Sequence, residues 1–447
     1  MKYLGIVALI LLLLVALASC YWMGNINTGS LTMDFSQIQA RQSGDVVRVY
    51  LLANDLLFSA GSGQPFAAEV PLGVDDRAVV KIDGLPVGPR YKALVGAGYI
   101  DQDVFHVDYY GESEEFDVSA GDDTTVATTL DYVYYYWGLD YSTDLMGKNL
   151  VGVAAGSFYV YAAEASKIHA VDSTGSLWDS YDLAADRDGF GLSSHRVNGL
   201  SKDNSGYFLD AFMDSNMGIV PFYYYGEGWD FDTSFSAGLG GDREIEESGV
   251  FDLGNDRAVF FRRSEGVGGK IIGVTPGSWL NRDTDKVTDM TVSNNNAYFA
   301  TEGGAFALPW DILPDPQPNF NDKRMGFSGP SEILSLGYVL PNKLLMGTTN
   351  GAWEAQLTSE SPVTIGTLTQ IPETAGEGIE MIEVSSSGSY QAFLSRYFLY
   401  IRNGLNVDKY PFFAILPGKV TDMTWFDDSR LYISGTEGLS VLHLGST

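Results

Sequence analysis

The second half of the chain repeats one pattern of short apolar stretches separated by polar turns. Each unit has a first stretch, a turn, a second stretch, a tight turn and a third stretch, each about six residues long. The first stretches begin at residues 150, 197, 249, 287, 333, 379 and 420, the second at 158, 206, 257, 296, 342, 389 and 429, and the third at 167, 217, 269, 304, 351, 397 and 438. Short apolar runs bounded by turn residues predict β-strands.

The spacing of the units predicts a β-propeller. The hexapeptide KVTDMT begins at Lys286 and again at Lys419, 133 residues later, which corresponds to three steps of about 44 residues. A weaker fourth stretch follows in five units, at residues 177, 229, 278, 363 and 409. Four short strands in a repeat of this length are typical of propeller blades, so we expect seven blades over residues 131–447. Chance recurrence of six residues, or two unrelated β domains, is the alternative.

Two details of the repeat predict how the blades turn and how the ring closes. The tight turns contain Gly304, Gly351 and Gly438, where glycine permits a positive φ. The last unit reaches Thr447 after its third strand, while the apolar segment 131–141 precedes the first unit without a role. We therefore expect residues 131–141 to supply the missing outer strand by pairing antiparallel with residues near 439–444, which leaves no unpaired edge in the ring.

Residues 30–130 alternate apolar and polar positions with a period of two, in eight candidate strands separated by turn residues. This pattern predicts a β-sandwich, and the expected fold is all-β: an N-terminal sandwich followed by a seven-bladed propeller. The motif Gly-Leu-Pro-Val-Gly at 84–88, with Tyr91 in the next strand, resembles the prealbumin-like or carboxypeptidase-regulatory-like modules of secreted bacterial proteins. The resemblance implies a spacer or adhesive unit without an active site.

The first twenty residues have the layout of an export signal. Lys2 precedes an apolar run over residues 4–18, which is too short to span a bilayer comfortably. The run ends in Leu-Ala-Ser followed by Cys20, the one cysteine of the chain, and this resembles the lipobox of bacterial lipoproteins. The resemblance implies a signal peptide over 1–19, lipidation of Cys20, a tether over 20–29 and a location in the cell envelope. Tyr21 stands where an Asp would retain the protein on the inner membrane, so the outer membrane is expected in a two-membrane cell. A plain secretory signal or a short anchor is the alternative.

Composition restricts the partners. The chain has 447 residues, 45% of them apolar, with 57 acidic and 27 basic side chains and a formal net charge of −30. A surface this acidic repels phosphate backbones, so we expect no nucleic-acid partner. Solubility explains the charge without an acidic binding site.

Metal and cofactor chemistry has little support in the sequence. The four histidines are scattered, the one cysteine is assigned to the lipid, and no cofactor is expected. Asp186, Asp188 and Gly189 match three positions of a calcium loop, but Ala184 and His195 stand where ligands are needed. A solvated loop between blades is the favoured interpretation of this segment.

Six carboxylates are candidates for the lining of a central channel. Asp289 and Asp422 occupy the same place in the two VTDMT strands, and four others are expected near that place in other blades, namely Asp252, Glu332, Glu380 and Glu383. An acidic channel would bind cations or hold paired carboxylates for glycosyl chemistry. The alternative is that each carboxylate accepts hydrogen bonds from a neighbouring blade.

The favoured function is a membrane-anchored, non-enzymatic binding or scaffold module for a protein or glycan partner. The alternative is an extracytoplasmic hydrolase or lyase that uses the channel carboxylates. The tyrosine runs at 134–136 and 223–225 are candidate sugar-stacking platforms, although packing between blades explains them equally well.

Overall fold

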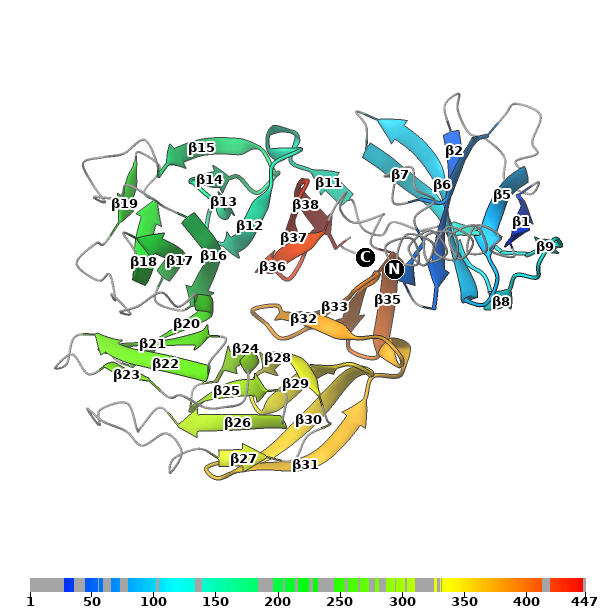
Figure 1. Ribbon diagram of the computed structural model, residues 1–447. Coiled ribbons are helices and arrows are strands. Elements are labelled where there is room, and N and C mark those ends of the chain that lie inside the picture. The colour runs from blue at the N-terminus through cyan, green and yellow to red at the C-terminus, as the bar shows by residue number, and fades with distance from the viewer. Residues whose placement is uncertain are drawn as a thin grey trace, which may run out of the picture. The chain divides into compact units, whose positions relative to one another are not determined.

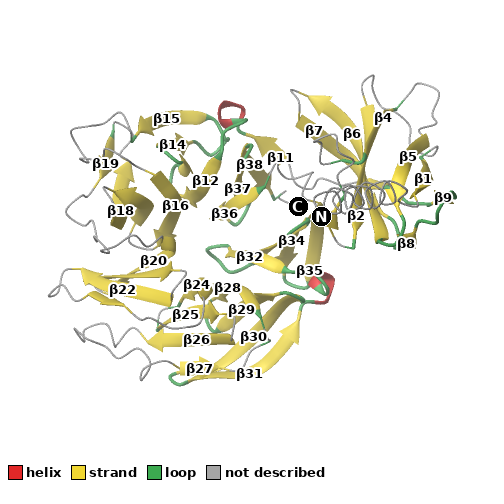
Figure 2. Ribbon diagram, viewed as in Figure 1, coloured by secondary structure: helices red, strands yellow, loops and turns green. Residues whose placement is uncertain are grey.

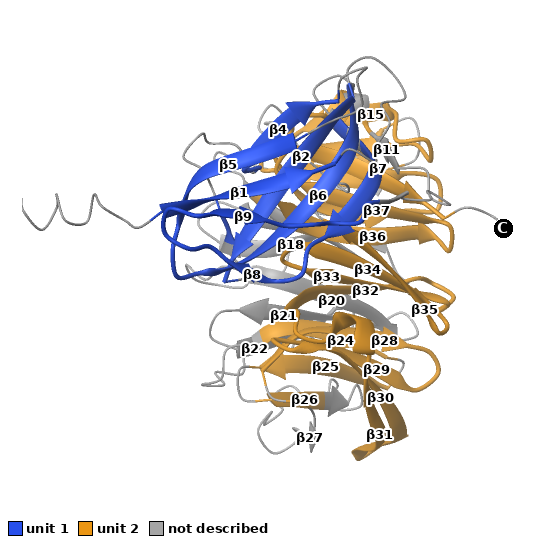
Figure 3. Cartoon of the chain, turned by 90° about the vertical axis from the view of Figure 1, so that its right-hand side faces the viewer, with its two compact units in different colours: residues 1–134 blue, residues 135–447 orange. Residues whose placement is uncertain are grey.

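A computed structural model gives the architecture of the protein. It describes residues 28–35, 45–54, 56–58, 66–72, 79–101, 104–132, 139–183, 196–203, 206–213, 216–224, 228–231, 245–253, 256–263, 266–272, 278–280, 287–293, 295–301, 304–309, 325–327, 330, 332–411 and 419–444. The chain divides into two compact units, Met1–Tyr134 and Tyr135–Thr447, and both are built from strands (Figures 2 and 3). The predicted all-β class is confirmed. Within the described ranges no helix has the length and apolar character needed to cross a bilayer.

The first unit contains two sheets. The smaller sheet has the order β5 (Val79–Pro86), β1 (Thr28–Asp34) and β9 (Asp123–Thr125). The larger sheet has the order β10 (Asp131–Tyr132), β7 (Val104–Glu112), β6 (Arg90–Asp101), β2 (Asp45–Ala53) and β3 (Leu56–Leu57), with β4 (Ala68–Pro71) on β2 and β8 (Phe116–Asp117) on β6.

One apolar core lies between these two sheets and makes the unit a β-sandwich. Leu31 of β1 and Val80 of β5 are fully buried in the same cluster as Val49 of β2 and Val95 of β6. Tyr91 at the start of β6 is also fully buried, and its hydroxyl donates a hydrogen bond of 2.8 Å to the carbonyl oxygen of Pro86. This bond ties the ring to the Gly-Leu-Pro-Val-Gly turn, which explains why the two features occur together.

The second unit consists of seven four-stranded antiparallel sheets, the blades, each ordered A to D from the ring centre outward. Blade 1 contains β12 (Leu150–Ala155), β13 (Val160–Glu164), β14 (Lys167–Val171) and β15 (Leu177–Asp182). Blade 2 contains β16 (Arg196–Asp203), β17 (Gly206–Met213), β18 (Asn216–Tyr224) and β19 (Trp229–Phe231). Blade 3 contains β20 (Ile245–Leu253), β21 (Asp256–Arg263), β22 (Gly266–Ile272) and β23 (Ser278–Leu280).

Blades 4 to 7 continue the series. Blade 4 contains β24 (Val287–Val292), β25 (Asn296–Thr301), β26 (Gly304–Pro309) and β27 (Met325–Phe327). Blade 5 contains β28 (Ile333–Val339), β29 (Lys343–Thr348), β30 (Gly351–Glu360) and β31 (Val363–Gln370), followed by the 3₁₀ turn η4 (Pro372–Thr374). Blade 6 contains β32 (Ile379–Val384), β33 (Tyr390–Ser395), β34 (Phe398–Asn403) and β35 (Asn406–Pro411). Blade 7 contains β36 (Val420–Asp427), β37 (Arg430–Gly435), β38 (Gly438–His443) and, as its outermost strand, β11 (Leu139–Tyr141).

The blades follow one another around a ring, and each A strand lies against the A strand of the next blade, including β36 against β12 (Figure 1). The seven-bladed propeller predicted from the repeat is therefore confirmed. The turn glycines Gly304, Gly351 and Gly438 have φ values of 133°, 100° and 136°, as their turns require. Four strands differ clearly from the expectation. Strands β20, β22 and β35 begin at Ile245, Gly266 and Asn406, ahead of the predicted starts at 249, 269 and 409, and β27 was not predicted.

Every A strand contains a β-bulge at the same register. One residue near its start has no direct partner on the B strand, so the strand bends there and re-aims its side chains. The shifts fall between Leu150/Gly152, Val197/Gly199, Ile245/Glu247, Val287/Asp289, Ile333/Ser335, Ile379/Met381 and Val420/Asp422. The sevenfold recurrence of this bulge gives the blades a common alignment that is independent of residue identity.

The segment predicted to close the ring divides between the two units. β11 pairs antiparallel with β38, with Leu139 opposite Leu442 and Tyr141 opposite Ser440. Residues 131–132 instead form β10 and pair with Tyr110 and Tyr109 of β7, so assigning all of 131–141 to blade 7 was wrong. The backbone groups at the edge of β7 need hydrogen-bond partners. Strand β10 supplies them before the chain reaches blade 7.

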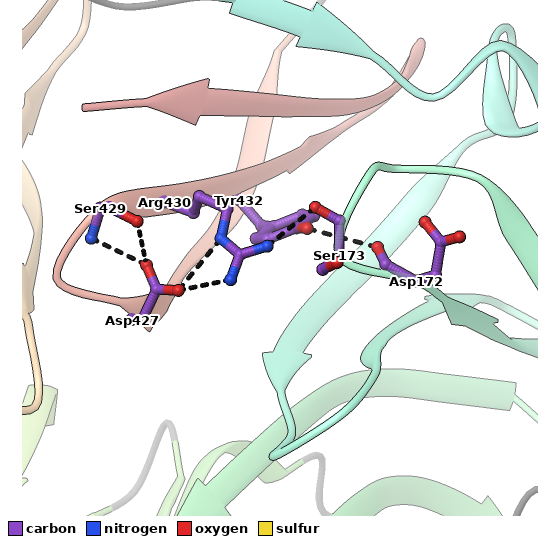
Figure 4. Close-up of polar contacts among 6 residues, drawn as sticks. All are labelled: Asp172, Ser173, Asp427, Ser429, Arg430 and Tyr432. Atoms are coloured by element: carbon purple, nitrogen blue, oxygen red, sulfur yellow. Dashed lines mark hydrogen bonds and ion pairs between the residues drawn. The ribbon is translucent and has the colours of Figure 1, made fainter. Parts of the chain in front are cut away.

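A second set of contacts joins blades 7 and 1 beyond the β11 pairing (Figure 4). Arg430 binds the carboxylate of Asp427 in its own blade and donates a 3.0 Å hydrogen bond to the carbonyl oxygen of Ser173 in blade 1. The hydroxyl of Tyr432 donates to the carbonyl oxygen of Asp172 at 3.3 Å. Two side chains of β37 therefore satisfy carbonyl groups in the turn that precedes β15.

We expect the double substitution Asp140→Pro and Tyr141→Pro to destabilise the whole propeller. Successive backbone N–H groups point to opposite sides of a strand, so one of the two prolines must remove a donor that faces β38. Loss of the paired segment should lower the free energy of unfolding by about 2–3 kcal/mol, at about 1 kcal/mol for each hydrogen bond. Hydrogen exchange followed by mass spectrometry should show faster exchange even in blades 4 and 5. Faster exchange confined to blade 7 would contradict a ring whose stability depends on closure.

Candidate functional site

Asp289 and Asp422, the two carboxylates expected at a central channel, bind the next blade. Asp289 accepts a 2.6 Å hydrogen bond from the backbone N–H of Leu336, and Asp422 accepts a 2.9 Å bond from that of Val153. The other oxygen of each carboxylate accepts the N–H of the residue that follows it, Met290 or Met423, at 2.8 Å. Both oxygens of each group are therefore used to orient strand A and to hold its neighbour.

The threonine before each of these aspartates makes the complementary bond. Thr288 donates to the carbonyl oxygen of Ile333 at 2.8 Å, and Thr421 donates to that of Leu150 at 3.0 Å. Each threonine is the bulged residue of its strand, and each acceptor is the first residue of the next A strand. The Thr-Asp pair thus satisfies one carbonyl and one N–H of the adjacent blade, which is why VTDMT recurs.

The other four candidate carboxylates do not share the register of Asp289 and Asp422. Glu380 is the bulged residue itself and is exposed, Glu332 precedes β28, and Glu383 lies two residues beyond the equivalent position. The backbone of Asp252 pairs with Arg257 near the far end of β20. None of the four residues directly follows the bulge of its strand, so their positions are not equivalent to those of Asp289 and Asp422.

The register places a residue at the shared position that the sequence analysis missed. Glu247 follows the bulge of β20, as Asp289 follows that of β24. The bulge gives no signal in a single sequence, so the strand was aligned from residue 249 instead.

Three predicted site residues, Cys20, Asp186 and Asp188, lie outside the described residues. Among the residues that are described, no group of three histidine, cysteine or acidic side chains could hold a metal ion.

One end of the propeller carries most of its exposed apolar side chains. The A–B and C–D connections of all blades lie at the same end, because the strands of each blade alternate in direction; we call this end the AB/CD face. Of the six large apolar side chains exposed in the described part of the propeller, only Leu368 lies within a strand away from these connections; the other five are Phe158, Leu177, Trp178, Leu340 and Leu405. Phe158 is 81% exposed and Trp178 is 60% exposed, so among the described side chains the highest concentration of exposed apolar groups is on blade 1.

Packed aromatic rings between blades 1 and 2 support the exposed Trp178. Trp178 contacts Tyr159 with ring centroids 6.0 Å apart, and Tyr159 meets Tyr224 edge to face at 5.2 Å. Tyr224 in turn lies 4.7 Å from Trp229. We call these four side chains the aromatic cluster. Rigid aromatic groups lose little conformational entropy when a partner binds, which makes such a cluster an effective docking element.

A carboxylate lies within the aromatic cluster. Asp179 accepts a 3.1 Å hydrogen bond from the indole N–H of Trp229. Burial and the negative charge of Asp179 raise the pKa of Tyr224 to about 12, so the phenol stays neutral at physiological pH. Of the two tyrosine runs considered as sugar platforms, residues 134–136 lie outside the described residues, and Tyr224 packs between blades.

A second polar cluster joins blades 4 and 5 at the same face. The hydroxyls of Tyr298 and Tyr338 both lie 3.0 Å from one oxygen of Glu360, and the two rings stack at 5.9 Å. Asn295 donates to the other carboxylate oxygen. Burial of the carboxyl group opposes ionisation, but the hydrogen bonds from Asn295 and the two tyrosines outweigh it and lower the pKa of Glu360. These groups bind one another, so their evident role is to join the blades next to exposed Leu340.

Similarity to known proteins is confined to the fold. No protein-family model matches this chain, and no curated protein matches it. Similar solved structures include YCF48 bound to D1 peptide (TM-score 0.50, 12% identity, 70% of this chain and 97% of that chain). Others are the streptogramin B lyase (0.48, 12%, 69% and 97%) and PorZ of Porphyromonas gingivalis (0.46, 15%, 68% and 38%). At these identities the likeness shows a β-propeller and no function.

We expect Asp422→Ala to destabilise the propeller by about 1–3 kcal/mol. The substitution leaves the buried N–H of Val153 without its acceptor across the junction of blades 7 and 1. Glu380→Ala is the matched control, because it removes an exposed carboxylate from another A strand, and it should change stability by no more than about 0.5 kcal/mol. Chemical denaturation of both variants measures the difference. Equal losses in the two variants would refute the structural role of the Asp422 carboxylate.

Proposed function

We propose that the protein is a lipid-anchored binding module of the cell envelope that docks a protein or glycan partner on the AB/CD face. The propeller is the binding body, and the N-terminal sandwich serves as a spacer between it and the membrane. The fold alone does not choose this function, because propellers of similar structure include a peptide-bound protein and a lyase.

The exposure of Phe158 and Trp178 carries the proposal. Large aromatic side chains raise the free energy of the protein when they face water, and a partner that covers them lowers it. Residues of this type contribute most of the binding energy at protein interfaces, where tryptophan is enriched among the dominant contacts. Trp178 packs on Tyr159, which is itself held by Tyr224 and Trp229, so this indole needs little ordering on binding.

The alternative of a hydrolase or lyase depends on channel carboxylates that are free to react. Asp289 and Asp422 use both oxygens to bind backbone N–H groups. A carboxylate that accepts several backbone hydrogen bonds is stabilised as an anion, which makes it a poor general acid. This arrangement supports the binding function over the enzymatic one.

We expect the double variant Phe158→Ala and Trp178→Ala to lose its partner while it remains folded. Removing two dominant contacts should weaken binding by at least about 100-fold, at roughly 1.4 kcal/mol for each tenfold. Quantitative affinity purification from cross-linked membranes compares the variant with the wild-type protein. Leu368→Ala is the matched control, since Leu368 is also exposed but lies on β31 outside the AB/CD connections.

The proposal fails if wild type and the double variant recover the same material. Protein or glycan in the wild-type sample alone identifies the class of partner. A melting temperature that matches the wild type excludes unfolding as the cause, because both substituted side chains are largely exposed.

We expect Cys20→Ala to release the protein from membranes. Lipidation adds about 0.8 kcal/mol of membrane affinity for each buried methylene group, and stable anchoring needs more than one acyl chain. The substitution removes the acceptor thiol, so metabolic labelling with a fatty acid should stop and the protein should move to the soluble fraction. Ser19→Ala is the control and should retain both properties, because alanine is also a small residue. Unchanged membrane partition of Cys20→Ala would show that another segment anchors the chain.

A further inference from the structure

Three polar side chains form a row across the outer part of blade 1. The Nδ1 atom of His169 lies 2.8 Å from the hydroxyl oxygen of Ser180, and its Nε2 atom lies 2.9 Å from the carboxylate of Glu164. The pairing of β13, β14 and β15 produces the row, because His169 stands directly opposite Ser180 and Glu164 lies two residues beyond the partner of His169 on β13. Side chains at these positions share one face of the sheet.

The geometry determines which nitrogen carries the proton. An ionised carboxylate can only accept, so Nε2 of His169 must be the donor to Glu164. In the neutral imidazole Nδ1 then has a free lone pair and accepts the hydroxyl proton of Ser180. Burial lowers the pKa of His169 below its ordinary value, opposed by its contact with Glu164, so the neutral form dominates at physiological pH.

The row combines a buried base with an accessible hydroxyl. His169 is only 4% exposed, whereas Ser180 on the outermost strand is exposed. Lys167 lies two residues before His169 on β14, opposite Asp182, and Lys148 lies 4.0 Å from Glu164. The positive charges of both ammonium groups disfavour protonation of the His169 imidazole and so lower its pKa.

The aromatic cluster described above lies on the opposite face of the same sheet. Ile168 and Ala170, which flank His169, pack with Tyr161 toward blade 2, whereas Val160 and Val171 pack toward blade 7. The row of Ser180, His169 and Glu164 is therefore separate from the proposed binding site and does not depend on it.

We propose that Ser180 is an activated nucleophile that accepts an acyl group from carboxylic esters, with His169 as general base and Glu164 orienting the imidazole. The Oγ atom attacks the ester carbonyl carbon, and its proton moves to Nδ1 of His169. The bond to the alcohol oxygen then breaks, and the departing alcohol takes the proton from Nδ1. The acyl group remains on Ser180 as an ester, and no oxidant or metal is required.

A fluorophosphonate probe tests the proposal on the full-length folded protein. The Oγ–P bond forms, fluoride leaves and the proton goes to His169, so the adduct records the same activation. Peptide mass spectrometry should show Ser180 labelled about 100-fold faster than Ser386, an exposed serine in the A–B connection of blade 6. Labelling of Ser180 at the rate of Ser386 would overturn the proposal.

Two variants and a pH profile separate activation from a structural role. Folded His169→Asn should lose the rate advantage, and Glu164→Gln, at a partly exposed position, should lower it about tenfold. If His169→Asn does not fold, the labelling rate of Glu164→Gln and the pH profile of the wild-type protein decide whether Ser180 is activated. The charged groups around His169 are Glu164 on β13, Lys167 on β14, Asp182 on β15 and Lys148 before β12.

The expected pH profile of labelling follows from the role of neutral His169 as the base. The labelling rate should rise as His169 loses its proton, at a pH below about 6.5, and should be level above pH 7. A rate that climbs tenfold per pH unit from 7 to 9 would show attack by an unassisted hydroxyl and overturn the proposal, as would an unchanged rate in folded Glu164→Gln.

Discussion

The contact between successive A strands is the constraint on which the propeller depends. These strands belong to different sheets, so no ladder of backbone hydrogen bonds joins them, yet they are the closest elements around the ring centre. A bulge at one shared position interrupts the pairing of every A strand with its B strand. Where the sequence is Thr-Asp, the two side chains bind a carbonyl and an N–H of the next blade. Ser335 meets the same need with a 2.9 Å bond to the carbonyl oxygen of Ile379. Gly152 has no side chain to offer, and its backbone comes so close that an added Cβ would lie 2.7 Å from the nitrogen of Leu200.

The strands were predictable from the sequence because their periodicity is local. The channel residues were not, because their positions depend on the register between neighbouring strands. The apolar stretches at 287, 333, 379 and 420 coincide with the starts of β24, β28, β32 and β36. Asp289 and Asp422 were placed together correctly because an identical hexapeptide aligned them. The other four carboxylates lie on strands of unlike sequence, where no shared motif marks the register, and one unrecognised bulge misplaces a residue by a full side-chain alternation. The division of 131–141 between two sheets was equally hidden, since the composition of the segment suits either edge.

The exposed aromatic side chains of the AB/CD face could not be predicted, because exposure is decided by neighbours far along the chain. Phe158 and Tyr159 are adjacent aromatic residues, yet one projects into solvent while the other packs on Tyr224 of the next blade. The tyrosine runs were candidate platforms, yet half-buried Tyr224 of the second run packs on Tyr159 and Trp229 between blades. Trp178 and Phe158, which gave no motif, are the groups left exposed. Tyr159 contacts the adjacent blade and lies beneath the surface of the AB/CD face. Phe158 and Trp178 are largely exposed and form that surface.

Strand β15 shows why the exposure of Trp178 points to a partner. It is the outermost strand of blade 1, and outermost strands resist pairing with other chains by presenting charged residues. Asp179 and Asp182 suit that role in a chain with a net charge of −30. Trp178 works against it, since it is 60% exposed next to Leu177, which is also exposed. The contact with Tyr159 does not explain why this residue is a tryptophan, because most of the indole surface lies outside that contact. Its exposed area lowers the free energy of the molecule only when another surface covers it, and the carboxylates beside it limit that surface to partners that tolerate or match negative charge.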